Sequence, residues 1–420
     1  MFRKHQILII SNLMNKKKIL FVIHRLDAGG AEKSLVSLLN SLPFDRFEID
    51  LLSVDPTGIF RNQVPSKVKL LDVPRELICQ NAQIMHKRFW KNVTFRTLCI
   101  KLQCIIGNRF RGKVSKNKLC HSQYYNKIWK RHIPDCPNAY DVAVSYIDGM
   151  NYYVIDHVNA DKKILWCHND YNKLNFVPEY DLPYYEMADN ICTISEQCKA
   201  SLIENFPTQK SKIKVVENIS SARLINAQAK MYDEMQFSGD GFIHDKRFKL
   251  VSIGRLSEQK GFDYAVDAAK ILKEKGVDFC WYILGEGPLR HVLENQAKKK
   301  CVTDVIKFIG VRSNPYPYIK NADLYVMPSR YEGKSIALDE AKILCKPIVV
   351  TNYPSVHDAI ENGKDGLVVD TTANAIAEGI IIMYNDEYLR YSFVQRLSKE
   401  SCGNEQKVIT KFLELVDINK

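Results

Sequence analysis

Two glutamates beyond one predicted strand are spaced so that both can contact a single ligand. Glu332 follows the apolar run 324–329, and seven residues separate it from Glu340. We expect Glu332 in a loop and Glu340 in the first turns of a helix that Ser335 caps. A carboxylate accepts two hydrogen bonds from a vicinal diol, so one glutamate can hold a ribose and the other a sugar hydroxyl. The alternative role is structural, since acids near a helix start also stabilise its positive end.

Backbone amides at the start of the same helix are a second binding feature. The first N–H groups of a helix have no partner within it and lie at the positive end of its dipole. We therefore expect them to point toward a diphosphate. The residues concerned are Gly333, Lys334, Ser335 and Ile336.

Two cations follow another predicted strand. Arg255 comes directly after the apolar run 248–254, and Lys260 lies five residues later, just before Gly261. Cations at the carboxyl end of a sheet strand are placed where they can neutralise a diphosphate. The alternative is that both are surface charges in a loop.

Glycine turns follow two of the predicted strands. Glycine lets backbone N–H groups approach a phosphate at a helix start, although tight strand-to-helix turns also need glycine for structural reasons. The first turn lacks G-x-G-x-x-G spacing, which disfavours a nicotinamide or flavin cofactor. The turns contain Gly29 and Gly30 in the first half of the chain, and Gly285, Glu286 and Gly287 in the second.

The elements that must position these groups alternate along the chain between apolar runs of strand length and amphipathic stretches of helix length. Near-continuous Val, Ile and Leu predict strands buried on both faces, as in a parallel sheet covered by helices. We predict an α/β protein with two tandem Rossmann-like doubly wound domains facing across a cleft. The strand-length runs are 18–24, 47–54, 140–146, 163–168, 190–195 and 212–218, then 248–254, 279–285, 306–310, 324–329, 347–352 and 366–370.

The domain divisions follow from the breaks in this alternation. The segment 226–247 is polar and has little periodicity, so it is the best linker candidate. The predicted divisions are an extension 1–17 with Met14 as a second candidate start, a first Rossmann-like domain 18–225, the linker 226–247, a second Rossmann-like domain 248–400, and a C-terminal helix 401–420. Packing of this helix on the first domain is one option.

A basic insertion interrupts the first domain. Residues 77–134 contain thirteen Lys or Arg and no Asp or Glu, in a chain of net charge +12. Aromatic residues such as Trp90 and Trp129 lie among these charges. This mixture suits an interfacial helix on an anionic membrane surface, reached through residues 87–131. A solvated basic insertion and a nucleic-acid surface are the alternatives, and we do not expect nucleic acid as a partner.

Cysteine usage and hydropathy bear on location. The twelve cysteines form no C-x-x-C pair, and no apolar stretch reaches the 18 residues that span a bilayer. These patterns predict reduced thiols in a cytoplasmic protein, peripheral on the inner face of the membrane if the basic insertion binds lipid.

Taken together, these motifs resemble a known family. Their order is a Gly-Gly turn, then G-R-L-S-x-x-K-G, L-G-E-G-P and S-R-Y-E-G-x-S-x-x-L-D-E-A. It is similar to the retaining nucleotide-sugar glycosyltransferases of the GT-B fold, family 4, over about residues 18–370. The resemblance implies transfer of a sugar from a UDP- or GDP-linked donor to a glycan or lipid-linked acceptor, in cell-surface polysaccharide or lipopolysaccharide assembly. It also implies that domain 18–225 is the acceptor side and that domain 248–400 binds the nucleotide sugar. No cofactor other than this donor is implied.

The resemblance also implies roles for individual residues. Arg255 and Lys260 would hold the donor diphosphate, Glu340 the ribose and Glu332 the transferred sugar. Gly30 would approach the diphosphate from the first domain. His168, which ends the run 163–168 in W-C-H-N-D, would lie beside the donor sugar, although a single histidine at a strand end is more often structural.

Some features depart from the family pattern. Lys334 replaces the usual apolar residue, and Asp339 stands where Leu is usual, which leaves the donor sugar open. The chain contains no Asp-x-Asp, so we expect no metal and assign stabilisation of the leaving diphosphate to cations and helix starts. Two other functions stay open: a sugar-nucleotide epimerase with the same fold, and nucleic-acid binding through residues 87–131.

Overall fold

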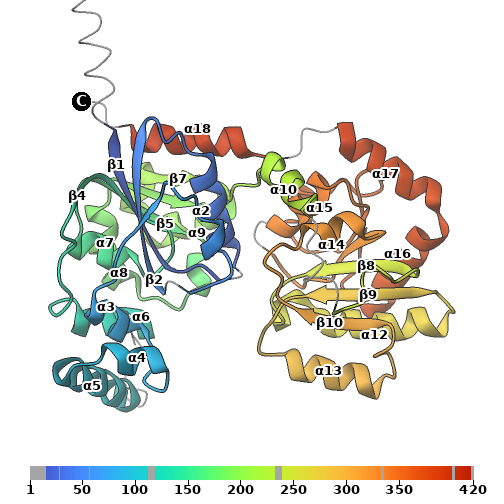
Figure 1. Ribbon diagram of the computed structural model, residues 1–420, viewed down its shortest axis with the longest axis horizontal. Coiled ribbons are helices and arrows are strands. Elements are labelled where there is room, and N and C mark those ends of the chain that lie inside the picture. Colours follow the sequence, from blue (N-terminus) through green and yellow to red (C-terminus); the bar gives the residue numbers. More distant parts are fainter. Residues whose placement is uncertain are drawn as a thin grey trace, which may run out of the picture. The chain divides into compact units, whose positions relative to one another are not determined.

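The chain folds into two compact units (Figure 1). The computed structural model describes residues 16–27, 29–55, 57–111, 119–231, 239–332, 335–399 and 403–417. The first unit comprises residues 1–219 together with 406–420, and the second comprises 220–405. Each unit is built around its own sheet, as expected for two tandem α/β domains.

The first unit contains a seven-stranded, wholly parallel sheet in the order β3-β2-β1-β4-β5-β6-β7. Its interior strand β1 buries Ile19 to Ile23 without interruption, because helices cover both faces of the sheet. The six apolar runs predicted in this half are all strands, and β3 is an additional short one. The strands are β1 (Lys17–Arg25), β2 (Phe47–Asp55), β3 (Lys69–Leu70), β4 (Ala139–Ser145), β5 (Asn159–Cys167), β6 (Asn190–Thr193) and β7 (Ile213–Val215).

Helices pack on this sheet through apolar side chains. In α2, for example, Leu35, Leu38 and Leu39 are fully buried, one turn apart on the face toward the sheet. The helices of this unit are α2 (Gly30–Ser41), α3 (Arg75–Asn81), α4 (Lys87–Asn92), α5 (Phe95–Arg111), α6 (His121–Trp129), α7 (Asn151–His157), α8 (Pro178–Met187) and α9 (Glu196–Asn205), with the 3-10 helices η1 (Arg61–Gln63), η2 (Tyr171–Lys173) and η3 (Pro207–Lys212).

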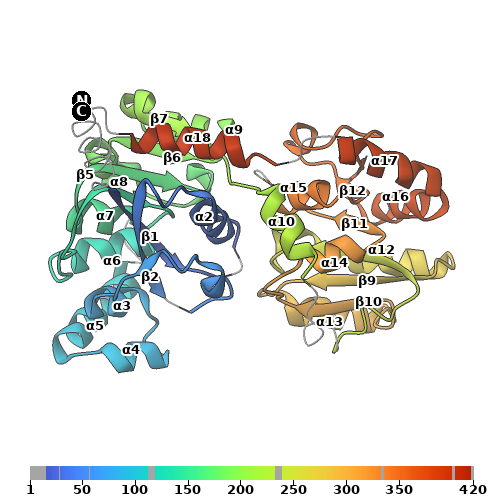
Figure 2. The ribbon, with the colours of Figure 1, turned by 45° about the horizontal axis from the view of Figure 1, so that its top comes forward.

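The C-terminal helix α18 (Glu405–Val416) packs on the first unit, to which residues 406–420 belong (Figure 2). Phe412 is fully buried, and its ring stacks on that of Phe21 in β1 with centroids 5.7 Å apart. The last element of the chain therefore completes the core formed by the first strand.

The second unit contains a six-stranded parallel sheet in the order β10-β9-β8-β11-β12-β13. All six runs predicted in this half form its strands. They are β8 (Phe248–Ile253), β9 (Phe279–Leu284), β10 (Ile306–Gly310), β11 (Leu324–Met327), β12 (Ile348–Thr351) and β13 (Leu367–Val369). The helices are α10 (Ala222–Ala229), α12 (Phe262–Glu274), α13 (Arg290–Lys299), α14 (Tyr316–Asn321), α15 (Ile336–Ile343), α16 (Ala373–Asn385) and α17 (Glu387–Lys399), with η4 (Glu258–Lys260) and η5 (Val356–Asp358).

The passage between the units differs from the expected linker 226–247. The first unit ends at Ile219, and α10 already belongs to the second unit. Ile225 of α10 and Phe242 are both buried in the core of the second unit. These apolar residues attach the stretch to the core of the second unit. Its polar composition and weak periodicity predicted a linker because only a few of its residues are apolar.

The order of the strands reverses once in each sheet. In the first sheet β1 lies between β2 and β4, and in the second β8 lies between β9 and β11. Loops that leave the two central strands on either side of such a point run in opposite directions, which opens a crevice at the carboxyl ends of the strands. Most of the predicted site residues lie at these two points.

Candidate functional site

The turns that follow the strands of the second sheet fit together backbone against backbone. A Cβ atom added to Gly285, whose φ is +148°, would lie 1.9 Å from the carbonyl oxygen of Gly254. One added to Gly287 would lie 2.3 Å from the oxygen of Leu256, whose N–H donates to the carbonyl of Glu286 at 3.0 Å. The glycines of these turns are therefore required for the close packing of the loops after β8 and β9.

The central contact of this site joins Lys260 to Glu332. Lys260 Nζ donates to Glu332 Oε1 at 2.6 Å, and Ser329 Oγ donates to the same oxygen at 2.8 Å. Only 7% of the Glu332 side chain and 19% of the Lys260 side chain are exposed. Lys260 follows β8 and Glu332 follows β11, so the pair lies at the point where the strand order reverses.

The loop that carries Glu332 is held from a second side. Arg330 forms two bonds to Asp263, Nη1 to Oδ1 at 2.8 Å and Nη2 to Oδ2 at 2.5 Å. Its guanidinium also lies 4.2 Å from the centre of the Tyr264 ring. This bidentate pair could not be predicted from the sequence, because Arg330 and Asp263 are 67 positions apart and neither belongs to a binding motif by itself.

Glu340 lies in α15 and is only 2% exposed. Tyr316 OH donates to its Oε1 at 3.2 Å, and burial raises the pKa of Tyr316 well above its usual value, so the hydroxyl stays protonated. Ser335 occupies the N-cap position of α15, but its hydroxyl makes no capping bond. It donates instead to Met327 Sδ at 3.5 Å, because the buried side chain turns toward β11. The prediction that the Ser335 side chain caps this helix is thus wrong.

The other predicted donor-side residues differ in their surroundings. Arg255 lies two residues after the end of β8 and is exposed. Glu286 forms an ion pair with Arg290 in the first turn of α13 and anchors that helix. Ile336 begins α15. Gly333 and Lys334 lie outside the described residues.

Two of the three residues predicted in the first unit lie at the reversal between β1 and β4. Gly29 is the N-cap of α2 and Gly30 its first residue. A Cβ atom on Gly29 would overlap the carboxylate of Glu32, at 1.9 Å from Oε2. The Gly-Gly turn thus makes room for an acidic side chain in the first turn of this helix.

His168 follows β5 and lies deep in the same unit. Its ring stacks on Trp166 with centroids 5.8 Å apart and lies 5.0 Å from Tyr146. Burial lowers the pKa of His168 to about 3. The imidazole is therefore neutral at neutral pH, which suits a group that forms hydrogen bonds and does not suit a general acid.

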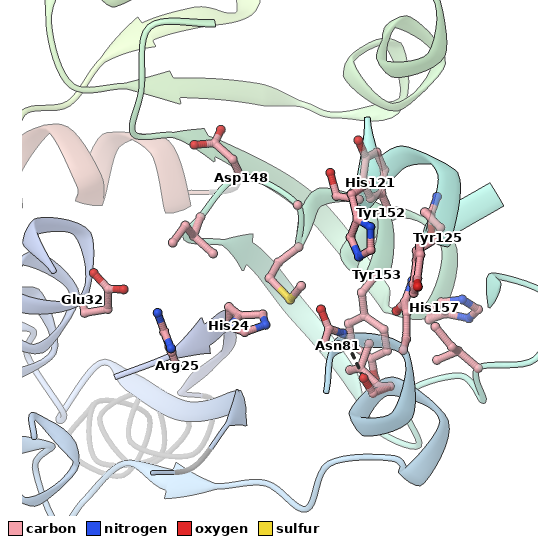
Figure 3. A pocket seen from close by; sticks show the side chains of 18 residues that line it. His24, Arg25, Glu32, Asn81, His121, Tyr125, Asp148, Tyr152, Tyr153 and His157 are labelled. Carbon is pink, nitrogen blue, oxygen red and sulfur yellow. Dashed lines mark hydrogen bonds between the residues drawn. The ribbon is translucent and has the colours of Figure 1, made fainter. Parts of the chain in front are cut away.

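A cavity of about 420 Å³ lies in the first unit beside these residues (Figure 3). His24 and Arg25 reach it from β1, Glu32 from α2 and Asp148 from the loop after β4, and side chains of α3, α6 and α7 complete its wall. This cavity could not be predicted from the sequence, because its residues come from five separate helices and strands and from the loop after β4. An acid soon after a strand end, Asp148, was the available signal.

Part of the basic insertion is folded into the core of the first unit. Phe89 and Trp129 are fully buried, so Trp129 is not available to a lipid surface. Apolar side chains are nevertheless exposed on and next to α4 and α5. These are Met85, Trp90, Phe95, Leu102, Ile105 and Ile106.

The described residues contain neither a cluster of metal-ligating side chains nor a membrane-spanning helix. Within the described parts of residues 16–417, no three His, Cys, Asp or Glu side chains are grouped so that they could hold a metal ion. In the same part of the chain, no helix has the length and apolar character needed to cross a bilayer.

The sequence of the second unit is similar to those of known glycosyltransferases. Residues 234–400 match the model of glycosyl transferases group 1. An uncharacterised glycosyltransferase of Methanocaldococcus jannaschii is 26% identical over 230 residues, which are 50% of this chain and 55% of that protein. N,N'-diacetylbacillosaminyl-diphospho-undecaprenol alpha-1,3-N-acetylgalactosaminyltransferase of Campylobacter jejuni is 24% identical over 278 residues, 64% of this chain and 69% of that protein. The chain thus spans between about half and two thirds of the length of these relatives.

Solved structures show the fold over nearly the whole chain. HepE of Anabaena in complex with UDP and glucose superposes with a TM-score of 0.64 at 14% identity, covering 95% of this chain and 98% of that one. WaaG, a glycosyltransferase involved in lipopolysaccharide biosynthesis, gives a TM-score of 0.59 at 13% identity, covering 94% and 99%. The predicted fold class, two Rossmann-like α/β domains of the GT-B type, is confirmed, as is the resemblance to glycosyltransferases.

Proposed function

We propose that this protein is a group 1 glycosyltransferase that moves a sugar from a nucleoside diphosphate donor, UDP- or GDP-linked, to a glycan or lipid-linked acceptor. The observation that carries the proposal is the Lys260–Glu332 pair at the strand-order reversal of the second sheet. A cation for phosphate and a carboxylate for sugar hydroxyls meet there, inside the part of the chain that matches the family. Both side chains are largely buried, so a ligand that separates them replaces one strong interaction with two.

The residues of the second unit divide the donor between them. Arg255 and Lys260 bind the diphosphate, where negative charge grows as the sugar-phosphate bond breaks. The backbone N–H groups at the start of α15 add to this stabilisation. Glu332 binds hydroxyls of the transferred sugar, and Glu340, held by Tyr316, binds the ribose. The absence of Asp-x-Asp from the sequence supports a metal-independent mechanism.

The chemical step retains the anomeric configuration. The bond from the anomeric carbon to the phosphate oxygen breaks through an oxocarbenium-like transition state, and the acceptor oxygen forms the new bond on the same face. The acceptor proton passes to the departing diphosphate. His168 remains neutral throughout, because burial holds its pKa near 3, and it positions the donor sugar by hydrogen bonding.

The acceptor class is supported by the relatives. The Campylobacter relative is named for a diphospho-undecaprenol-linked sugar acceptor, and WaaG for lipopolysaccharide biosynthesis. We therefore assign this protein to cell-surface polysaccharide or lipopolysaccharide assembly. Of the two proposed donor nucleotides, UDP is supported by HepE, which was solved with UDP.

A membrane location is supported by the surface of α4 and α5. Trp90 is 57% exposed and Phe95 is 84% exposed, in a segment with many basic residues and no acidic ones. Exposed aromatic and aliphatic side chains next to basic charge bind anionic leaflets. We place the protein in the cytoplasm, peripheral on the inner face of the membrane, near a lipid-linked acceptor.

The proposal is tested by incubating the protein with UDP- and GDP-sugars and a bacterial lipid extract that contains lipid-linked glycans. Mass spectrometry detects the added sugar, and NMR reports the anomeric configuration of the product. Transfer with retention supports the proposal. Interconversion of the free sugar nucleotide without transfer supports the epimerase instead, and salt-sensitive binding of RNA or DNA without nucleotide-sugar binding supports the nucleic-acid alternative.

A further inference from the structure

Arg330 lies two residues before Glu332 and reaches the segment that carries Lys260. Its backbone N–H donates to the carbonyl oxygen of Gln259 at 2.8 Å, and its Nη1 donates to that of Glu258 at 2.7 Å. Both acceptors belong to η4, the 3-10 helix in which Lys260 is the last residue. Arg330 therefore holds the residues directly before Lys260.

The same guanidinium also holds residues that follow Lys260. Its Nη1 and Nη2 donate to the two carboxylate oxygens of Asp263 at 2.8 and 2.5 Å, and its carbon lies 4.2 Å from the centre of the Tyr264 ring. Asp263 and Tyr264 lie in the first turn of α12. One side chain thus fixes both flanks of Lys260 relative to the loop that carries Glu332.

Two further contacts hold the same two loops together. Gln259 Nε2 donates to the carbonyl oxygen of Tyr331 at 3.0 Å. Gly261 leaves room for the carbonyl oxygen of Pro328, which would lie 2.0 Å from an added Cβ atom. The cation and the carboxylate of the proposed donor site are therefore positioned by one set of contacts between the loops after β8 and β11.

The Arg330–Asp263 pair is only partly buried. The side chain of Arg330 is 24% exposed and that of Asp263 is 37% exposed. Ion pairs that remain in contact with water add little net stability, because the charges lose little hydration and are well screened. Two parallel N–H···O bonds nevertheless restrict the orientation of a guanidinium strongly. The pair therefore suits a role in positioning more than a role in stabilising the fold.

We propose that Arg330 is a positioning residue that holds Lys260 and Glu332 at the separation the donor requires. Both of its terminal nitrogens donate to protein atoms, so it acts through these two residues without touching the donor. A displacement of about 1 Å in a binding group can cost about 100-fold in rate. The inference rests on the proposed glycosyltransferase function, for which it identifies a residue outside the donor contacts.

The test compares Arg330→Lys with Arg247→Lys in the full chain. Lysine keeps the charge but lacks the planar fork, so each change removes one bidentate pair with an aspartate. Arg247 is a matched control, since its Nε and Nη2 bind Asp245 at 2.9 and 2.7 Å and its side chain is 29% exposed. It directly precedes β8, at the opposite end of that strand from Lys260.

The first measurement needs no substrate and reports the coupling between Lys260 and Glu332. Lys260→Met and Glu332→Gln, alone and combined, are unfolded by denaturant in the wild-type, Arg330→Lys and Arg247→Lys backgrounds. The ratio of unfolding constants in each cycle gives the coupling. We expect it to fall by about fivefold or more with Arg330→Lys and to stay unchanged with Arg247→Lys. Equal coupling in all three backgrounds overturns the inference.

The second measurement is steady-state transfer from the UDP- or GDP-sugar. Arg330→Lys should lower kcat by about tenfold or more and change the donor KM by less than about threefold, because a displaced cation is needed most as charge grows on the leaving diphosphate. An equal loss with Arg247→Lys overturns the positioning role, since both variants lose a comparable ion pair.

A further variant and the wild type keep the outcomes separable. If Arg330→Lys does not fold, Asp263→Asn removes the charge of its partly exposed partner and should reduce both kcat and the coupling. A wild-type protein that neither binds nor transfers a nucleotide sugar contradicts the proposed function. The coupling measurement then still decides whether Arg330 positions Lys260 and Glu332.

Discussion

Lys260 Nζ and Glu332 Oε1 lie 2.6 Å apart although 72 positions separate the two residues in sequence. The cation follows β8 and the carboxylate follows β11, the two strands between which the order of the second sheet reverses. Their contact holds the cation and the carboxylate of the proposed donor site in place before a donor arrives. Catalytic groups that are positioned in advance need little reorganisation during the reaction.

Removing the cation should damage both stability and transfer. Lys260→Ala leaves the largely buried Glu332 without its partner, so we expect a loss of about 3 kcal/mol in the free energy of unfolding. Donor turnover should fall by about 100-fold or more, because the leaving diphosphate loses a cation. Denaturant unfolding and steady-state kinetics measure the two effects. Lys270→Ala, which breaks the exposed Lys270–Glu274 pair, should change either quantity little. Equal effects of both variants would contradict this role for Lys260.

Gly261 should be irreplaceable where Gly276 is not. Both have left-handed backbone, with φ of +64° and +73°. A Cβ on Gly261 would lie 2.0 Å from the carbonyl oxygen of Pro328, whereas none of the described atoms lies within 4 Å of one on Gly276. We expect Gly276→Ala to cost about 1–2 kcal/mol and Gly261→Ala clearly more. Thermal unfolding compares the two, and a similar cost at both sites would show that the close approach of the loops after β8 and β11 is unimportant.

His168 should make the first unit less stable in mild acid. Its pKa is near 3 in the folded protein and about 6.5 when unfolded, so the unfolded chain binds the extra proton between these values. The free energy of unfolding is therefore highest above pH 6.5. It decreases as the pH falls, by about 2 kcal/mol between pH 7 and pH 5. Unfolding of wild type and of His168→Phe at both pH values measures this. The variant should lack that part of the pH dependence, and parallel curves would contradict a buried neutral imidazole.

The exposed and the buried tryptophan of the basic insertion should behave differently. Trp90→Ser combined with Phe95→Ser should weaken binding to phosphatidylglycerol vesicles by about tenfold or more without unfolding the protein. Trp129→Ala should instead cost about 3–5 kcal/mol of stability, because its side chain is fully buried. Sedimentation with vesicles measures binding.

An exposed aromatic pair elsewhere supplies the control for this comparison. Tyr388 and Tyr391 of α17 are also exposed, but lie in the second unit. Tyr388→Ser with Tyr391→Ser should leave vesicle binding unchanged. Equal loss with this pair would mean that exposed aromatic side chains bind lipid without the basic insertion.

The parallel sheets could be predicted from sequence because their signal is local. Each apolar run, such as 279–284, is buried on both faces and needs no knowledge of distant residues. α10 escaped prediction because only a few apolar anchors, among them Ile225, hold it to the second unit. The burial of Trp129 depends on how α3 to α6 pack, which composition does not reveal.

The residues of the candidate site could be predicted in part from the sequence, but their arrangement could not. Arg255, Lys260 and Glu332 could be located because each follows a recognisable strand. Their mutual arrangement could not, since the Lys260–Glu332 bond depends on which strands are neighbours. The cavity beside Asp148 required the folded positions of five elements, and none of its side chains belongs to a motif.

The central claim is tested most directly by thermal unfolding of the wild type, Arg255→Ala and Lys246→Ala with UDP, GDP, ADP and CDP. Arg255 and Lys246 are both exposed, so neither change should impair folding. A nucleotide at about 100 times its dissociation constant stabilises by roughly 2.7 kcal/mol, enough to raise the melting temperature measurably. We predict that UDP or GDP stabilises the wild type and Lys246→Ala, and that Arg255→Ala loses most of this response. A folded protein that responds to none of the four nucleotides would contradict the proposed function.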